Sequence, residues 1–494
     1  MRSPRRRNAS AQGRWKKIAL WSISAVAAMG VVGVVVVKVA IENYLHGEGF
    51  RRFVSEKSSQ TLHAAGEFEP FHFSGMTFYS NAFVAQGSEF AAFAQVHLDQ
   101  VRAEVSARRI SEQVWEVDNV SAQRLDVQLD GPRIKLEESG QISAAGLLPT
   151  AMSSVSSPVA EPAAGGGWLP NRVEVKSASI HEANVSWGRE GLPGGLVQGI
   201  RLEALARDGG WNISGDGGTI APAGLSAFDV TKLQLRYKAP SILVQSMELR
   251  QPASGGGVRD GNGTVRVDGE VRLGESLELR AQLASLTITP LLPPDWRLRL
   301  HGDLSGTVDA RAKLPASGGA ASGAVISGKL SLANGQLEAL PILDQIATFT
   351  LLPQYRRLAL SKAGAEYRLE NGRLSVKNLL VESVGLIRIE GSFTVIDSML
   401  DGTLQVGVPA SSLQWLPGAQ AKVFTESRDG YVWAPMRVSG PTNKPNEDLS
   451  ERLKAAALGV AVDVAKDVLL DGTQKSKDAV KGMLDLLMPS LKVP

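Results

Sequence analysis

The stretch that decides the fold is GLIRIEGSFTVIDSMLDGTLQVGVP (385–409), in which apolar and polar residues alternate. Its apolar parity holds Ile387, Ile389, Phe393, Val395, Leu404, Val406 and Val408. Successive side chains of a strand point to opposite faces, so this stretch predicts strands with one apolar and one polar face. A turn is expected at Asp401-Gly402, because Asp-Gly between alternating runs is typical of a hairpin.

The same alternation recurs upstream. Leu277, Leu279 and Leu283 share a parity in ESLELRAQLAS, and Trp296, Leu298 and Leu300 share one in DWRLRL. A second hairpin turn is expected at Glu370-Asn371-Gly372. Almost no helical pattern interrupts residues 170–440, apart from a short helix expected over 340–349. The sequence therefore predicts a mainly β protein built as a long antiparallel meander.

Composition excludes several classes of protein. The chain has 494 residues, 43% of them hydrophobic and 21% charged, which is neither a disordered nor a polytopic membrane composition. It has no Cys, which excludes disulfide scaffolds, thiol nucleophiles and Cys-ligated zinc. Residues 1–17 carry seven basic residues and no acid. Because the formal net charge of the whole chain is +3, the remaining residues together carry −4. Nucleic-acid binders carry positive charge on the folded part, so this class is disfavoured.

The basic tail precedes IALWSISAVAAMGVVGVVVV (18–37), a run without charge. As a helix, twenty residues span about 30 Å, the thickness of a bilayer core. The positive-inside bias places the N-terminus in the cytoplasm and the bulk of the chain on the other side of the membrane. The alternative is a signal peptide cleaved near Ala25-Val26-Ala27, which would leave too short an apolar stretch before the cleavage site.

The pattern divides the chain into nine segments. They are a basic cytoplasmic tail (1–17), a transmembrane anchor (18–40), a juxtamembrane helix (41–65), an N-terminal β segment (66–148), a Pro/Ala/Gly/Ser linker (149–171), a middle β segment (172–314), a second linker (315–324), a C-terminal β segment (325–446) and C-terminal amphipathic helices (447–490).

Two segments have two interpretations each. Nine of the thirteen Phe residues lie between Phe50 and Phe93, which fits either a compact aromatic core or an apolar mouth beside the membrane. The C-terminal helices fit either a cap on the last strands or a contact with a membrane or partner protein.

No motif calls for catalysis. The six His residues are scattered without metal-ligand spacing, no Gly-x-Ser-x-Gly is present, and GGGVRDGNG (255–263) lacks the ending of a phosphate loop. Glu366, Glu370, Glu382 and Glu390 occupy the polar parity of strands, as expected of a solvated face. We therefore expect no enzyme, no catalytic residue, no metal and no cofactor.

The last third of the chain resembles the C-terminal region of AsmA-like proteins. The resemblance begins at GKLSLANGQLEALPILDQIATF (328–349) and continues through 385–409. It includes SLQWLPG (412–418) and MRVSGPTNKP (436–445). It is good over 325–446, fair over 15–135, where the anchor and following helix fit, and weak between. Such proteins are anchored in the inner membrane of diderm bacteria and are related to bridge-like lipid-transfer proteins.

The resemblance implies a long antiparallel sheet curled into a trough with an apolar interior, and a role in phospholipid transport or outer-membrane assembly. The partners implied are the inner membrane, phospholipids and envelope proteins. The chain is short for the family, which puts direct bridging of the envelope in doubt. We expect the apolar parities at 277–283, 296–300, 387–395 and 404–408 to line the lipid-binding face. A closed periplasmic β-sandwich serving as a scaffold requires the same alternation and stays open as the alternative.

Overall fold

The computed structural model describes residues 48–89, 91, 93–106, 109, 112, 114–134, 172–188, 194–252, 263–314, 322–338, 343–344, 347, 353–413, 417–456 and 459. The predicted tail, anchor and first linker, and most of the C-terminal helical segment, lie outside these residues. None of the helices among the described residues has the length and hydropathy needed to span a bilayer. The chain forms two compact units, Met1–Ile180 and His181–Pro494, each described by itself.

The first unit packs one helix on a small sheet. Its elements are α2 (Glu48–Leu62), β1 (Ala64–Phe68), β2 (His72–Ser74), β3 (Thr77–Gly87), β4 (Gln95–Ser106), β5 (Val114–Gln128) and β6 (Arg172–Val175), and β7 (Ser177–Trp187) runs across the boundary to the second unit. Strand β3 pairs with β1 and β2 on one side and with β4 on the other, and β4 pairs with β5, all antiparallel. Strand β6 joins β5 in parallel. The core of the unit includes the buried side chains of Phe83, Phe93 and Val101.

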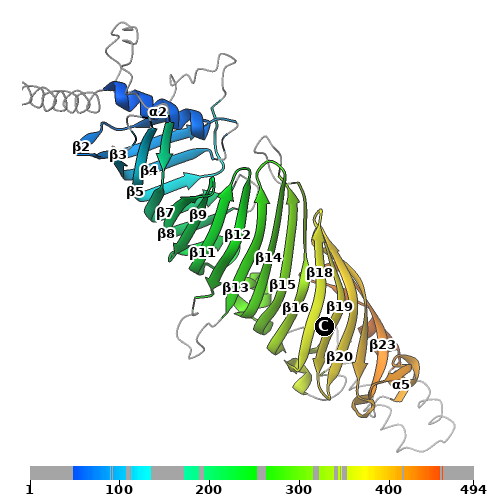
Figure 1. The fold of residues 1–494 in the computed structure, drawn as a ribbon. Helices are drawn as coiled ribbons and strands as arrows, with labels where there is room; N and C mark the ends of the chain where they lie inside the picture. The colour runs from blue at the N-terminus through cyan, green and yellow to red at the C-terminus, as the bar shows by residue number, and fades with distance from the viewer. Residues whose placement is uncertain are drawn as a thin grey trace, which may run out of the picture. The chain divides into compact units, whose positions relative to one another are not determined.

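The second unit is an antiparallel sheet in which neighbouring strands mostly follow one another in the chain (Figure 1). They are β8 (Gly195–Arg207), β9 (Gly210–Asp216), β10 (Thr219–Pro222), β11 (Phe228–Lys238), β12 (Ser241–Arg250), β13 (Thr264–Arg272), β14 (Ser276–Thr287), β15 (Leu300–Lys313), β16 (Ser322–Glu338), β17 (Arg357–Leu360), β18 (Lys362–Glu370), β19 (Arg373–Ser383), β20 (Ile387–Ile396), β21 (Met399–Val408), β22 (Glu426–Arg428), β23 (Tyr431–Pro441) and β24 (Asn446–Glu447). Three positions in this order hold two strands each: β9 and β10 lie between β8 and β11, β17 and β18 lie beside β16, and β22 and β24 lie beyond β23, which itself pairs with β21. The mainly β fold and the antiparallel meander predicted from the sequence are confirmed.

Short helices lie between strands in this unit. They are η2 (Thr289–Leu291), α3 (Pro294–Arg297), η3 (Pro353–Arg356), η4 (Ala410–Leu413) and α5 (Pro417–Lys422). A further helical turn begins at 449 and continues to 456. Among them, η3, η4, α5 and 449–456 supply side chains to one large buried group, defined here as the cap cluster.

Two local predictions were wrong. The stretch 296–300 does not form a strand, because Pro294 starts α3 and β15 begins only at Leu300. Proline is favoured in the first turn of a helix, where its missing N–H is not needed. Trp296 and Leu298 therefore lie outside the sheet, and Leu298 is 78% exposed.

The turn expected at Asp401-Gly402 is also displaced. Asp397 and Ser398, with φ of 49° and 62°, make the turn between β20 and β21, and Gly402 lies inside β21 opposite Phe393. A Cβ on Gly402 would lie 2.4 Å from Cβ of Phe393, so glycine is required by the close approach of that neighbour. The turn expected around Asn371-Gly372 is confirmed, with φ of 50° and 74° at these two residues.

Candidate functional site

Apolar residues of the second unit form rows that cross the sheet at right angles to the strands. In an antiparallel pair, residues directly opposite each other point to the same face. The register can therefore be followed from strand to strand across β8, β9, β11 to β16, β18 to β21 and β23. The first row, called row A, is Ala204, Ile213, Leu235, Val244, Gly269, Leu279, Ala310, Ile326, Leu369, Leu374, Val395, Leu400 and Gly440.

A second row runs beside the first, two residues away on each strand and three residues away on β12, where a bulge lies between the rows. Row B is Leu202, Gly215, Leu233, Met247, Val267, Ala281, Val308, Gly328, Tyr367, Val376, Phe393, Gly402 and Val438. No charged side chain occurs in either row, and the only hydroxyl is that of Tyr367. Thirteen strands, joined in twelve steps of about 4.8 Å, give each row a length of roughly 58 Å.

The residues between the two rows point to the opposite face and are polar. They include Glu203, Ser214, Gln234, Asp268, Arg280, Asp309, Ser327, Arg368, Ser375, Thr394, Asp401 and Ser439. Ion pairs join neighbouring strands on this face, as between Arg280 Nε and Asp309 Oδ1 at 2.8 Å and between Lys329 Nζ and Glu366 Oε1 at 2.7 Å. The sheet of the second unit therefore has one apolar and one charged face, and the apolar face is the candidate site.

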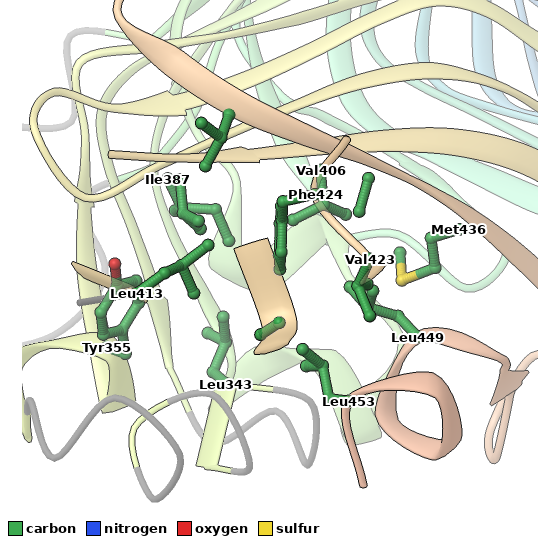
Figure 2. Packing of buried hydrophobic residues seen from close by; sticks show 14 of the residues in the cluster. Leu343, Tyr355, Ile387, Val406, Leu413, Val423, Phe424, Met436, Leu449 and Leu453 are labelled. Carbon is green, nitrogen blue, oxygen red and sulfur yellow. The ribbon is translucent and has the colours of Figure 1, made fainter. Parts of the chain in front are cut away.

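Protein already covers one side of the apolar face. In the cap cluster, Ile387, Val406 and Met436 of the sheet pack against Leu413 of η4, Phe424 after α5 and Leu453 of the C-terminal turn (Figure 2). A second buried group, defined as the middle cluster, includes Phe228, Val230, Leu249 and Leu286. Leu304, at the margin of the middle cluster, pairs with Leu332, at the margin of the cap cluster. Both clusters therefore lie toward the same ends of the strands.

The members of the two clusters are buried, whereas no residue of row A is. Along β15, Leu304 borders the middle cluster, Val308 belongs to row B and Ala310 to row A. No residue of row A is buried; all are half-buried except Leu369, which is 36% exposed. In row B only Val267 and Val376 are buried, each 8% exposed. The apolar face is thus packed at one side and accessible along row A.

The sequence-predicted site residues divide into three groups. Leu277, Leu279, Phe393 and Val395 lie on the accessible part of the apolar face, whereas Leu283 packs against the middle cluster. Ile387, Leu404, Val406 and Val408 are buried in the cap cluster, and Ile389 and Leu300 pack against it. Trp296 and Leu298 are not part of the face, as described above. The second group keeps the predicted orientation, but its apolar surface is already occupied by protein.

Most of the accessible face was not predicted as a site. Leu235 on β11, Val244 on β12 and Ile326 on β16 belong to row A. In SILVQSMELR a bulge between Val244 and Met247 shifts the apolar parity from even to odd numbers, which hides the alternation. The strand could have been recognised from the alternation of apolar and polar residues before and after the bulge, taken separately.

Three of the four glutamates on the predicted polar parity are partly exposed, whereas Glu382 is buried, with 6% of its surface exposed. Glu366, Glu370, Glu382 and Glu390 pair with Lys329, Arg368, Lys362 and Arg388 respectively. Lys329 lowers the pKa of Glu366, and Arg266 lowers that of Glu248. Within the part of the chain that the structure describes, no group of three or more metal-ligating side chains is placed to hold an ion.

Comparisons with protein-family models, with curated proteins and with solved structures give no match to this chain.

Proposed function

We propose that the apolar face of the second unit holds lipid acyl chains, and that the protein contributes to phospholipid transport or outer-membrane assembly. The observation that carries the proposal is the alignment of rows A and B, which gives an accessible hydrocarbon-like surface across thirteen strands. Contiguous exposed apolar surface on a soluble domain is uncommon and marks a binding site.

Energetics favour this ligand. Exposing a hydrocarbon chain to water costs about 0.8 kcal/mol per CH₂, or roughly 12 kcal/mol for a sixteen-carbon chain. Row A offers apolar contacts without a fixed donor or acceptor, so an acyl chain can lie at many positions along it. The lipid headgroup can stay in water beyond the strand ends. Binding of this kind requires no enzymatic step, catalytic residue, metal or cofactor.

The dimensions fit several lipids at once. An acyl chain occupies about half of a bilayer core of about 30 Å, whereas row A is roughly 58 Å long. Side-by-side occupation would let lipids follow one another along the sheet. A face of this length is short for crossing an envelope alone, so transport between two membranes would require another copy or an envelope partner.

The resemblance to AsmA-like proteins supports the cellular setting. We propose that the segment 18–40 anchors the chain once in the inner membrane, with the basic tail (1–17) in the cytoplasm and the bulk of the chain in the periplasm. Partners would be the inner membrane, phospholipids and envelope proteins.

A second candidate is a periplasmic scaffold that binds no lipid. The cap cluster favours it, because protein segments already cover one side of the apolar face, and a partner protein could cover the rest in the same way. A closed sandwich needs two facing sheets. In the second unit, strands β8 to β23 are joined into one sheet by consecutive pairings instead.

Lipid analysis of the purified full chain separates the two candidates. We expect wild type to retain phospholipid and Ala310→Glu to lose most of it, because a carboxylate in the middle of row A would have to be desolvated against acyl chains. The control is Thr307→Glu, on the same strand but with its side chain on the charged face. Mass spectrometry of extracted lipids is the measurement. Equal lipid content in the folded wild type and Ala310→Glu, or none in wild type, would favour the scaffold.

A further inference from the structure

The first unit contains an aromatic group that reaches from its core to its surface. Ring centroids of Phe83 and Phe68 are 4.3 Å apart, those of Phe68 and Phe71 5.4 Å, and those of Phe71 and Phe78 5.5 Å. Phe73 extends the group, with its centroid 6.2 Å from that of Phe78. We call these five residues the phenylalanine chain.

Burial decreases along the phenylalanine chain. Phe83 is 2% exposed and belongs to the buried core, against which Phe68 packs. Phe71, Phe73 and Phe78 are half-buried and lie beyond that core. Met76, in the turn that follows, is 43% exposed. Phe68 and Phe83 therefore belong to the aromatic core of the first strands, whereas the outer three rings keep part of their surface accessible and Met76 is exposed.

The hairpin that carries the outer rings is well defined. Phe73 of β2 pairs with Phe78 of β3, and Phe78 pairs on its other side with Ala103 of β4. The turn is Gly75-Met76, and Gly75 has a φ of +65°, which glycine adopts readily. A Cβ built on Gly75 meets nothing within 4 Å, so the tip of the hairpin faces open space.

The N-terminal end of α2 lies beside the same aromatic group. Ser59 Oγ accepts a hydrogen bond from Gly66 N at 3.0 Å, and Arg51 Nη1 donates to the Phe68 carbonyl at 3.3 Å. Helix α2 thus runs along β1 with its first turn next to Phe68. Figure 1 shows the start of α2 and strand β2 at the same end of the first unit.

This end of α2 is where the chain arrives from the apolar run 18–37. Only residues 38–47 separate that run from Glu48. Ten residues reach at most about 35 Å when fully extended. If 18–40 is the anchor, the start of α2 is tethered within that distance of the bilayer, and Phe68 lies beside this first turn.

We propose that the β2–β3 hairpin docks on the lipid bilayer that the anchor spans, with Met76 and Phe73 at the boundary between headgroups and acyl chains. Phenylalanine and other large apolar side chains are the residues that interfacial elements bury at this depth. The inference rests on the anchor in the proposed function, but not on lipid binding by rows A and B.

Cysteine probes test the docking directly, because the natural chain has no Cys. Met76→Cys carries an environment-sensitive fluorophore, and the full chain is reconstituted into vesicles of phosphatidylethanolamine and phosphatidylglycerol with brominated acyl chains. The matched control is Gln95→Cys, exposed at the far end of β4. Glu104 on the same strand pairs with Thr77, next to the hairpin turn. Gln95 is nine residues away from Glu104 along β4, which is about 30 Å. Met29→Cys reports on the anchor.

We expect the fluorophore at position 76 to show blue-shifted emission and strong quenching by the brominated lipids. The fluorophore at position 29 should also be quenched, and the one at position 95 should show neither effect. Adding Phe73→Ser to Met76→Cys should reduce the quenching several-fold. Quenching at 29 with none at 76 would overturn the docking while leaving the anchor intact. A blue shift at 76 without quenching would also overturn it, because an apolar protein surface or a second copy would then cover the hairpin. No quenching at 29 would refute the anchor and the docking together.

Discussion

Tyr355 is the polar residue on which the cap cluster depends. Its side chain is fully buried, and its hydroxyl donates to the Leu386 carbonyl at 2.9 Å and lies 3.3 Å from Ser412 Oγ. Burial raises the pKa of Tyr355, so it is a neutral donor at physiological pH. A buried carbonyl left without its donor is costly, which makes this hydroxyl a sensitive probe of cap stability.

We expect Tyr355→Phe to lower the free energy of unfolding by about 1 to 2 kcal/mol. Urea denaturation followed by tryptophan fluorescence measures this, because Trp433 is 1% exposed beside the cap cluster. The control is Tyr367→Phe in row B, whose hydroxyl makes no hydrogen bond among the described residues, and which should change stability little. Equal stability of wild type and Tyr355→Phe would show that the cap does not require this hydrogen bond.

Single residues also show where sequence reasoning fails. Alternation correctly placed Phe393 and Val395 on the accessible face, because the side-chain period of a strand is local. It failed at Trp296, where Pro293-Pro294 before the stretch was the signal for a helix start. The burial of Val406 could not be predicted, because other members of the cap cluster, Tyr355, Phe424 and Leu453, come from distant segments.

Pairs of strands are held together on the charged face by exposed ion pairs. Lys329 of β16 and Glu366 of β18 are 2.7 Å apart, and the hydrogen bond to Lys329 lowers the pKa of Glu366 below its ordinary value of 4.5. A carboxylate with a depressed pKa stabilises the fold above its unfolded-state pKa. That contribution is lost as the pH falls through the lower, folded-state pKa.

We therefore expect Glu366→Gln to lower the urea midpoint slightly at pH 7, and the difference from wild type to vanish as the pH falls below 4.5. High salt should reduce the same difference, because the pair is exposed. Glu203→Gln is the control, since Glu203 on β8 forms no ion pair within the described part of the chain. A difference that persists unchanged at acidic pH would contradict this account of the pair.

At the scale of the whole molecule, the function proposed for the chain depends on the contrast between the two faces of the second unit. Charged residues between the rows keep one face in water, while rows A and B present only apolar groups and one tyrosine on the other. The alternation that predicts this contrast is present in the sequence. The register that aligns thirteen strands into continuous rows is set by turns and bulges and could not be predicted from it.

The most direct measurement is photo-crosslinking of the full chain in cells, with a photoreactive amino acid placed at Leu279 or Val395 in row A. The matched controls are Gln282 on β14 and Ser392 on β20, which lie on the same strands but point to the charged face. Mass spectrometry of the irradiated protein should find phospholipid adducts at Leu279 and Val395 and none at the two controls. Adducts absent from row A, or equally frequent on both faces, would contradict the proposal that the apolar face holds acyl chains.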